Sequence, residues 1–480
     1  MLLYESVVAA MRRHPGTLVG AGPAARSFGD LLAEHSVKRK LLDEVLRSGG
    51  ARILLATKNH PGYISSLLAV WRHGSLPILA DPSSTPHDID TLVQDCGIDA
   101  VITESAGTTP LDDRSWLHRT GFDGPRPETA SDTEVCRLTS GSTRTPACIE
   151  FSAAAVLNAA STWSSAVGLT ARDRILCFAG VYNGLAFNTT LIPGLLTGAA
   201  MVLPSTLPTG GAILRHIGAS EPSILVAFPA AYERLAAYPV RDTDQTLRKA
   251  LSGIRLRLSS AAALSDTVAA AVETLSGPVC DYYGIAETGP VTFDPEPRRG
   301  SHGRPLPGVT LRVAPRETDG IPVLHVRTES MGTKYLNYPG ELERAVAADG
   351  CYISSDTGEF TAGRLRLTGR VRPGLNIGGR KFSIETVRDP IRAYPGVVDC
   401  HVTQLTTPSG RDCVGALVAA ESALEVSALK TYLRARLAEF QVPEVVVVVP
   451  ELPRGSTGKV RSAEVIDLLT AVFAPAEEAS

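Results

Sequence analysis

Residues 135–146 read Val135-Cys136-Arg137-Leu138-Thr139-Ser140-Gly141-Ser142-Thr143-Arg144-Thr145-Pro146, a short apolar strand that leads into a turn. The turn offers four hydroxyl groups, those of Thr139, Ser140, Ser142 and Thr143. These hydroxyls and several backbone N–H groups can converge on an anion. Gly141 allows the backbone to approach the anion closely, and Arg144 adds a positive charge. The stretch therefore predicts a phosphate-binding loop, although an ordinary Ser/Thr turn fits this segment alone equally well.

Composition limits the classes of protein that the chain can belong to. With 480 residues it exceeds what one hydrophobic core usually serves, so two or more domains are expected. Lys and Arg number 47 against 50 Asp and Glu, a formal charge of -3. This balance gives no electrostatic footprint for nucleic acid or an anionic membrane, so we expect a small-molecule partner.

The chain offers no targeting or membrane signal. The longest β-branched run, Val445 to Val449, has the length of a buried strand and falls far short of the ~18 residues of a membrane helix. At the N-terminus an acidic residue, Glu5, comes early and the arginines follow the apolar residues, which is the wrong order for a secretory signal. We therefore expect a cytoplasmic protein without a membrane partner.

Strands and helices alternate along most of the chain. Strands are expected at 51–56, 77–82 and 98–103 with a helix at 63–73 before the second strand, and residues 104–131 read as a surface loop. The alternation returns twice after the hydroxyl-rich turn, with helices expected at 153–167 and 186–196. Strand–helix–strand alternation predicts α/β architecture with doubly wound, parallel sheets.

The last third of the chain changes character. Residues 303–356 contain short strands broken by Gly and Pro, as in a small β-barrel. A Gly/Pro/Arg-rich connector then begins near Val371, and a separate mixed α+β pattern follows it. We expect a large N-terminal domain over residues 1–370 and a small C-terminal domain over residues 371–480.

The hydroxyl-rich loop resembles the phosphate loop of the adenylate-forming (AMP-binding) superfamily, Thr-Ser-Gly-Ser-Thr-Gly-x-Pro-Lys-Gly. This superfamily includes acyl-CoA synthetases, aryl-acid ligases, peptide-synthetase adenylation domains and luciferases. The chain keeps the first half of the loop, while Arg144, Ala147 and Cys148 stand at the family's Gly, Lys and Gly. The resemblance implies that residues 139–144 bind the phosphates of ATP, and Arg144 is our candidate for the missing lysine charge.

The segment Tyr283-Gly284-Ile285-Ala286-Glu287 resembles the family's Tyr-Gly-x-Thr-Glu motif, and Ser354-Ser355-Asp356 resembles its Thr-Gly-Asp motif. The resemblance implies that Tyr283 flanks adenine, that Asp356 and Arg370 contact ribose, and that Glu287 holds Mg2+ on the triphosphate, a fitting ligand for a hard cation. The full set expected around adenine and ribose is Ala261, Ala262, Asp281, Tyr282, Tyr283, Gly284, Asp356 and Arg370.

The C-terminal segment resembles the family in two further places. Arg372 stands at the hinge position about which the family's mobile small domain swings, and Asn376 replaces a lysine of the loop that lines the thiol entry. The stretch Leu452 to Arg461 contains Gly458-Lys459, where the family carries its adenylation lysine. Lys459 is therefore the expected catalytic residue, because an ammonium group stabilises the charge that develops at the α-phosphate.

The acid pocket is expected between residues 181–185 and the strand-end loops, with Asn183, Phe228, Ser259, Ser260 and Ile285 as its contact residues. Peptide-synthetase domains hold the ammonium group of an α-amino acid with an aspartate in the first of these segments. Residues 178–188 contain no acid. This absence favours an aryl or small acyl acid, with Asn183 available to hydrogen-bond a ring substituent.

The resemblance implies an ATP- and Mg2+-dependent ligase. It would activate a carboxylic acid as an acyl-adenylate and transfer the acyl group to a thiol of a carrier protein or CoA. The departures from the motifs leave other hypotheses open. One is altered chemistry on the same scaffold, such as an amide ligase or a nitrite-activating diazotase acting on an aryl amine. Another is a weakly catalytic nucleotide-binding homologue or interaction protein.

Overall fold

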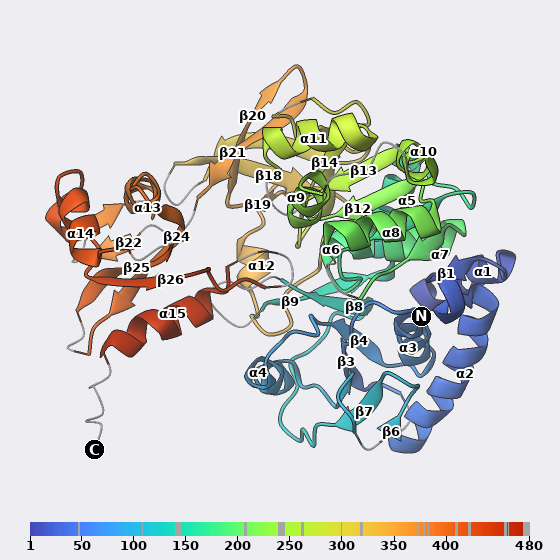
Figure 1. Cartoon of the computed structure of the whole chain (residues 1–480). Helices are drawn as coiled ribbons and strands as arrows, with labels where there is room; N and C mark the ends of the chain where they lie inside the picture. The colour runs from blue at the N-terminus through green and yellow to red at the C-terminus, as the bar shows by residue number, and fades with distance from the viewer. Residues whose placement is uncertain are drawn as a thin grey trace, which may run out of the picture. The chain divides into compact units, whose positions relative to one another are not determined.

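The computed structural model describes residues 1–46, 49–107, 109–139, 146–205, 209–238, 245–260, 264–298, 300–316, 320–371, 375–377, 380–382, 384–408, 411–420, 424–455, 458 and 460–473. The chain divides into two compact units (Figure 1). The first unit ends at Gly369 and the second begins at Arg370.

The first unit contains a nine-stranded sheet, sheet A, among its described residues. In spatial order its strands are β16 (Arg304–Pro305), β15 (Gly289–Phe293), β14 (Val279–Ile285), β13 (Leu256–Ser259), β12 (Ile224–Ala227), β10 (Arg174–Cys177), β11 (Ala200–Val202), β1 (Leu18–Val19) and β2 (Arg26–Ser27). Strands β14 to β1 pair in parallel, and the two edges add antiparallel strands. The carboxyl ends of β12, β13 and β14 therefore lie along one edge of the sheet.

A seven-stranded sheet, sheet B, lies in the same unit within the described residues. Its spatial order is β6 (Thr109–Pro110), β7 (Trp116–Arg119), β5 (Ala100–Thr103), β3 (Arg52–Ala56), β4 (Leu76–Leu79), β8 (Thr133–Leu138) and β9 (Cys148–Ser152). The inner strands are parallel, whereas β9 returns antiparallel to β8. Strand β8 thus leads directly into the hydroxyl-rich loop, and β9 leads directly out of it.

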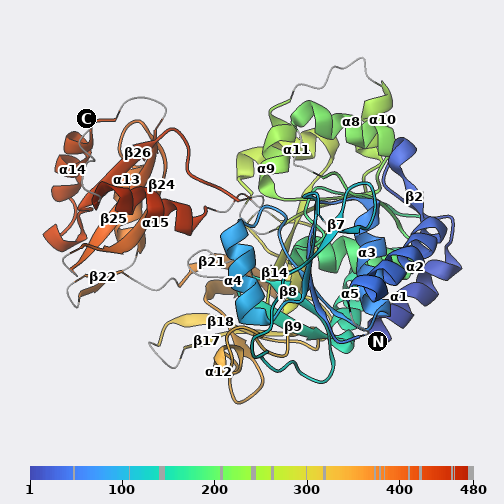
Figure 2. The ribbon, with the colours of Figure 1, turned by 90° about the horizontal axis from the view of Figure 1, so that it is seen from below.

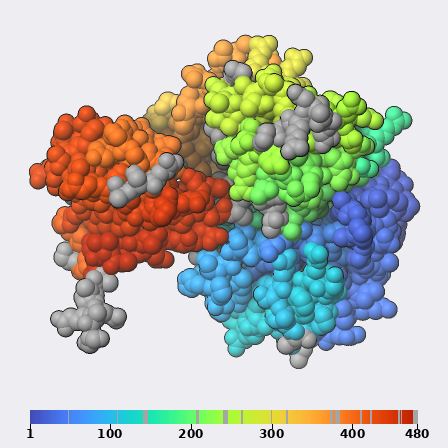
Figure 3. All heavy atoms as spheres, in the orientation of Figure 1, coloured from blue at the N-terminus to red at the C-terminus, as the bar shows by residue number. Residues whose placement is uncertain are grey.

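Helices cover the sheets in groups. They are α1 (Leu2–Arg13), η1 (Gly22–Ala24), α2 (Phe28–Val45), α3 (Pro61–Arg72), α4 (Pro86–Cys96), α5 (Ala153–Val167), α6 (Gly184–Ala186), η2 (Phe187–Leu191), α7 (Ile192–Thr197), α8 (Gly210–Ser220), α9 (Pro229–Ala236), α10 (Gln245–Ser252), α11 (Asp266–Ser276) and α12 (Glu341–Arg344). Helices α1, α2, α3, α5 and α7 pack together near both sheets (Figures 1 and 2). Helices α8 to α11 pack on one another along sheet A, where the space-filling view is green to yellow-green (Figure 3).

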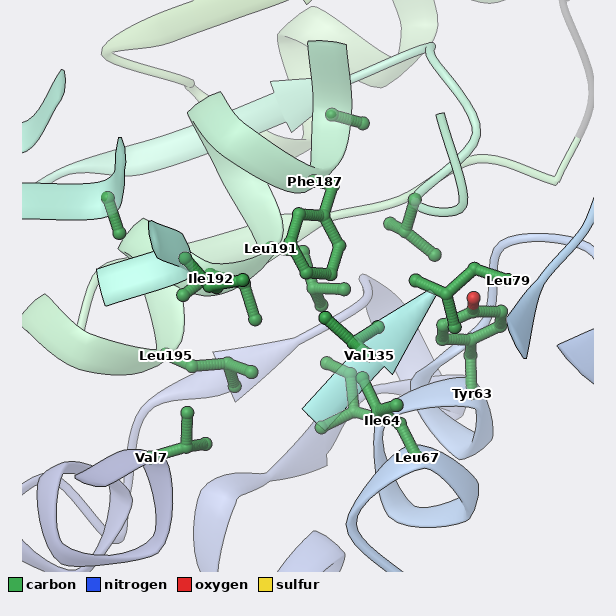
Figure 4. Close-up of a cluster of buried hydrophobic side chains, with 14 of the residues drawn as sticks. Val7, Tyr63, Ile64, Leu67, Leu79, Val135, Phe187, Leu191, Ile192 and Leu195 are labelled. Carbon is green, nitrogen blue, oxygen red and sulfur yellow. The ribbon is translucent and has the colours of Figure 1, made fainter. Parts of the chain in front are cut away.

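The largest core cluster joins the two sheets of the first unit. In Figure 4, Phe187 and Leu191 of the α6–α7 region face Val135 of β8, and Ile64 of α3 approaches the same strand from the other side. Each of these four side chains is completely buried. Burial of this much apolar surface is the dominant stabilising contribution, and it fixes the strand that precedes the hydroxyl-rich loop.

The first unit also contains a three-stranded antiparallel sheet and a two-stranded sheet among its described residues. The strands are β17 (Thr310–Pro315), β18 (Pro322–Arg327), β19 (Tyr352–Ile353), β20 (Asp356–Thr361) and β21 (Arg364–Arg370). Strands β17 to β19 fall in the region 303–356 where a small barrel was expected, and the short strands there are as predicted, whereas β20 and β21 extend beyond it. Closure into a barrel stays a prediction.

The second unit contains its own sheets, helices and hydrophobic core. Its elements are β22 (Leu375–Ile377), β23 (Arg380–Phe382), α13 (Ile384–Arg392), β24 (Val397–Thr406), β25 (Asp412–Ala420), α14 (Val426–Arg434), η3 (Glu439–Gln441), β26 (Val445–Val449), α15 (Ser462–Thr470) and η4 (Ala471–Phe473). Across the described residues of the chain, no helix combines the length and the apolar character that crossing a bilayer requires.

Candidate active site

The two ends of the hydroxyl-rich loop are tied together. The backbone N–H of Thr139 donates to the carbonyl of Ala147 at 2.9 Å, and the N–H of Ala147 donates to Oγ1 of Thr139, also at 2.9 Å. Asn337 adds a second clamp, because its amide donates to the carbonyl of Pro146 at 3.0 Å and accepts from the N–H of Cys148 at 2.8 Å. Sequence reasoning missed Asn337, since nothing local links it to a loop about 190 residues away.

Several predicted site residues lie outside the described residues, and their roles stay predictions. They are Ser140, Gly141, Ser142, Thr143, Arg144, Ala261, Ala262, Arg372 and Lys459. Arg370 is described at the end of β21, where it is exposed.

The carboxyl ends of adjacent parallel strands bring several predicted residues together. In the register of sheet A, Ala227 pairs with Ser259 and Ser259 pairs with Asp281, so β12, β13 and β14 end side by side. Ser259 is completely buried, and its Oγ finds no hydrogen-bond partner among the described residues. Ser260 and Ile285 are half-buried. Ligands of open α/β sheets bind beyond such strand ends, so this edge is the natural place for a site.

Two residues predicted to contact adenosine touch each other. The hydroxyl of Tyr283 donates to Oδ2 of Asp356 at 2.7 Å, although 73 residues separate them in the sequence. The Oγ of Ser354 also accepts from the backbone N–H of Asp356 at 3.0 Å. The first contact holds the Asp356 carboxylate at the hydroxyl end of the Tyr283 ring, and the second orders the backbone of Asp356. Binding of adenine and ribose by this pair stays a prediction.

Gly284 follows Tyr283 at a break in the strand register. A Cβ at this position would lie 2.9 Å from the carbonyl oxygen of Gly289, closer than real Cβ atoms come. Only glycine therefore allows this close turn between β14 and β15.

Glu287 lies just after β14 and is only 9% exposed. Its Oε1 accepts a hydrogen bond of 2.7 Å from the hydroxyl of Tyr335, a residue that sequence reasoning did not select. Among the described residues no group donates to Oε2, which suits a carboxylate that binds a hard cation. No cluster of three His, Cys, Asp or Glu side chains that could hold a metal ion occurs in the described part of the chain.

Burial changes the acid–base properties of the strand that carries these residues. It raises the pKa of Asp281 to about 6, and no charge or hydrogen bond from the described residues opposes that shift. Burial also raises the pKa of Tyr282, whose ring packs edge-on against Trp163 with centroids 5.4 Å apart. Tyr282 thus points toward the core, while Tyr283 points toward Asp356.

The residues predicted for the acid pocket have structural roles as well. Asn183 caps α6, since its Oδ1 accepts from the N–H of Leu185 at 3.0 Å. Phe228, at the start of α9, is 5% exposed and belongs to the main core. Both lie beyond the carboxyl ends of neighbouring strands, Asn183 after β10 and Phe228 after β12.

Comparison with known proteins defines the class as adenylate-forming ligases. Residues 42–336 match the family model of AMP-binding enzymes, and the chain belongs to this family. It is 26% identical over 512 residues to 4-chlorobenzoate–CoA ligase of an Arthrobacter species, covering 95% of this chain and 93% of that protein. It is 24% identical over 484 residues to 3-hydroxybenzoate–CoA ligase of Aromatoleum sp. (strain CIB), covering 92% and 90%.

The fold matches that of solved structures of the class. The crystal structure of ATP-bound MatB from Rhodopseudomonas palustris superimposes with a TM-score of 0.74 at 22% identity, covering 98% of this chain and 99% of that one. The predicted α/β fold, the membership of the adenylate-forming superfamily and the assignment as an ATP-dependent ligase are confirmed. ATP, with its accompanying Mg2+, follows from this family membership.

Proposed function

We propose that this protein activates an aryl or small acyl carboxylic acid as an acyl-adenylate and transfers the acyl group to the thiol of CoA or of a carrier protein. In the first step a carboxylate oxygen attacks the α-phosphorus of ATP and pyrophosphate leaves. In the second step the thiol sulfur attacks the acyl carbonyl carbon and AMP leaves. The mixed anhydride is needed because a carboxylate at neutral pH is a poor electrophile.

The observation that carries this proposal is the contact between Tyr283 and Asp356 at the ends of the central strands. The carboxylate can bind ribose hydroxyls while the ring flanks adenine. Glu287 lies four residues beyond Tyr283, where it can hold a magnesium ion that neutralises phosphate charge. The clamped base of the loop between β8 and β9 supports a phosphate site at residues 139–144.

The remaining steps fall to the C-terminal unit. We assign the hinge to Arg372 and the transition-state cation to Lys459, so that residues 371–480 act as a mobile small domain. A loop lysine brought in by domain movement can stabilise developing charge without remaining in the site between turnovers.

Two observations support an aryl or small acyl acid. Residues 178–188 contain no carboxylate that could pair with an α-ammonium group. The relatives named above are ligases of substituted benzoates. The CoA ligase names also favour CoA as the acceptor, with a carrier protein as the alternative thiol.

The test is ATP–pyrophosphate exchange across a panel of aryl, short acyl and α-amino acids, followed by thioester detection with CoA and with a phosphopantetheinylated carrier protein. We expect exchange with at least one aryl or acyl acid and none with α-amino acids. Mass spectrometry of the product separates thioester from amide, and nitrite with an aryl amine tests for a diazonium product. Absence of exchange with every acid would favour a nucleotide-binding homologue.

A further inference from the structure

Arg137 of β8 is a buried cation that the proposed mechanism does not use. The residue is 4% exposed, and its guanidinium carbon lies 4.2 Å from the ring centroid of Phe151 and 5.0 Å from that of Phe187. Within the described part of the chain its Nε has no hydrogen-bond partner, and no hydrogen bond or ion pair joins the guanidinium to another residue. Two aromatic faces attract the cation but accept none of its in-plane hydrogen bonds.

Two other buried arginines of the same unit show what a structural role looks like. Arg52 is 7% exposed and donates to the carbonyls of Cys96 at 2.6 Å and Pro127 at 2.5 Å. Arg257 is 4% exposed and donates to the carbonyl of Ile254 at 2.7 Å and, through Nε, to Ser276 at 2.7 Å. Both therefore have the acceptors that a buried charge requires, whereas Arg137 lacks them.

The surroundings of Arg137 place it beside the proposed acid pocket. A Cβ at Gly184 would lie 3.1 Å from Nη1, so the residue that follows Asn183 makes room for the guanidinium. The ring of Phe187 lies over the guanidinium, and Figure 4 shows Phe187 facing Val135 of the same strand, β8. Burial lowers the pKa of Arg137 to about 10, opposed by the negative potential of Tyr282 and Glu287, so the side chain stays charged at neutral pH.

We propose that Arg137 determines substrate specificity by binding a second carboxylate of the acid, so that the preferred substrate is an aryl or short acyl dicarboxylic acid. This inference rests on the proposed function and names its substrate class. The planar guanidinium matches a carboxylate with two parallel hydrogen bonds. A single negative charge balances the single buried cation, whereas a doubly charged phosphate would leave excess negative charge near Glu287.

The bound carboxylate is not the reacting one. A carboxylate held by two hydrogen bonds from arginine has its lone pairs occupied, which makes it a weaker nucleophile toward the α-phosphorus. Pairing of the distal carboxylate with Arg137 does not slow adenylate formation, because that carboxylate is not the nucleophile. Arg137 therefore selects and orients the acid through the end that does not react.

The experiment uses matched pairs of acids that differ by one carboxylate, benzoate with isophthalate and terephthalate, and butyrate with succinate and glutarate. The parent should show about 100-fold higher kcat/KM in adenylate formation for at least one diacid than for its partner. Arg137→Met, which keeps the length and apolar contacts, should lower kcat/KM for that diacid about 100-fold and leave the monoacid unchanged or improved. Arg137→Lys keeps the charge but loses the planar pair of N–H donors, so its kcat/KM for the diacid should lie between those of the parent and Arg137→Met.

Arg257→Met is the matched control, because it removes an equally buried arginine that is hydrogen-bonded to the fold. It should lower the melting temperature and leave the ratio of diacid to monoacid unchanged in the folded fraction. Arg137→Met should melt no lower than the parent, since it removes an uncompensated buried charge. For the parent protein, the melting temperature should rise more when the preferred diacid is added than when its matched monoacid is added.

The outcomes separate this inference from the proposed function. Adenylate formation from monoacids with no diacid preference in the parent, or an unchanged ratio in Arg137→Met, would overturn the role of Arg137 and leave the ligase assignment standing. A lower melting temperature of Arg137→Met with an unchanged ratio would assign Arg137 to the fold. A third outcome is that a diacid stabilises the parent but not Arg137→Met, while no acid gives an adenylate. That result would support the role of Arg137 and contradict the proposed chemistry.

Discussion

Two sets of polar groups lie near the carboxyl ends of the central strands, and they differ in how the protein satisfies them. On the proposed nucleotide side Tyr283 donates to Asp356 and Tyr335 donates to Glu287, each at 2.7 Å. In the other set Ser259 and Arg137 are buried, and in the part of the chain that the structure describes neither Ser259 Oγ nor Arg137 Nε has a hydrogen-bond partner. Burial alone raises the pKa of Asp281, which belongs to this second set.

The difference indicates two kinds of preparation for ligand binding. A paired group is already held in place, so a nucleotide gains a preorganised partner at little entropic cost. An unpaired buried group costs stability until a ligand satisfies it, which is usual where a protein retains polar groups for function. The paired set should therefore matter for the fold even without ligand, and the unpaired set should matter mainly with it.

The largest effect is expected from a residue in neither set. If both sets only bind and orient the substrates, the positive charge that acts on the chemical step must come from a residue outside them, and Lys459 is the candidate. Lys459→Ala should lower adenylate formation by about 10²- to 10³-fold, the usual scale for one electrostatic group that acts in the transition state. Rapid-quench measurement of adenylate, with ATP binding measured separately, checks this.

ATP affinity and the melting temperature of Lys459→Ala should remain close to the parent's, and thioester formation from a supplied acyl-adenylate should survive. Adenylate formation at the parent rate would show that a residue other than Lys459 supplies the charge acting on the α-phosphate, and Arg144 would then be the next candidate.

The second effect concerns Asp281 and pH. Its folded pKa of about 6 lies above that of an aspartate in an unfolded chain, so the folded state binds this proton more tightly. The stability from Asp281 is fully present below the unfolded pKa near 4 and is lost as pH rises to about 6. Asp281→Asn should therefore be more stable than the parent at pH 7, by about 3 kcal/mol at most, and close to it near pH 4.

Urea unfolding of parent and variant between pH 4 and pH 8 measures this difference. Asp123→Asn, at an exposed loop position, is the control and should follow the parent at every pH. A constant difference between Asp281→Asn and the parent would show that the carboxyl group has a partner in the folded state and belongs in the paired set.

Much of this organisation could be predicted from the sequence because it depends on local patterns. The helix expected at 153–167 begins and ends as predicted, since Ser152 caps its N-terminus and Gly168 adopts φ of 59° at its end. The strand-end motif from Tyr283 to Glu287 was likewise visible, because glycine and polar residues interrupt an apolar run.

Long-range pairing could not be predicted in this way. Residues 104–131 were expected to form a loop, yet β6 and β7 form the edge of sheet B there, because β7 finds β5 as an antiparallel partner. The helix expected at 186–196 is divided into α6, η2 and α7, with a π-helical turn over Phe187–Leu191. Tyr335 and Asn337 contact the site from about 50 and 190 residues away, where no sequence spacing could indicate them.

The smallest effects test the comparison most directly, through two substitutions that each remove one hydroxyl group. Tyr335→Phe removes the donor to Glu287 and leaves a carboxylate that is 9% exposed with one partner fewer. Such a loss costs about 1–2 kcal/mol of the free energy of unfolding, because the acceptor keeps its desolvation cost without the bond. Ser259→Ala removes a completely buried hydroxyl whose Oγ has no hydrogen-bond partner in the structure.

Ser259→Ala should be at least as stable as the parent, because no hydrogen bond is broken and a buried hydroxyl without a partner is removed. Chemical denaturation without ligands, at pH 7 and with m-values checked for equality, gives both numbers. Equal costs for the two variants would mean that Ser259 is satisfied in solution, as by an ordered water molecule, and the distinction between the two sets would fail there. If Tyr335→Phe did not lower the free energy of unfolding, the distinction would also be contradicted, because the contact with Glu287 would then add nothing to the stability of the fold. The predicted asymmetry, a measurable cost at Tyr335 and none at Ser259, follows only if the nucleotide side is completed by the protein and the acid side by its substrate.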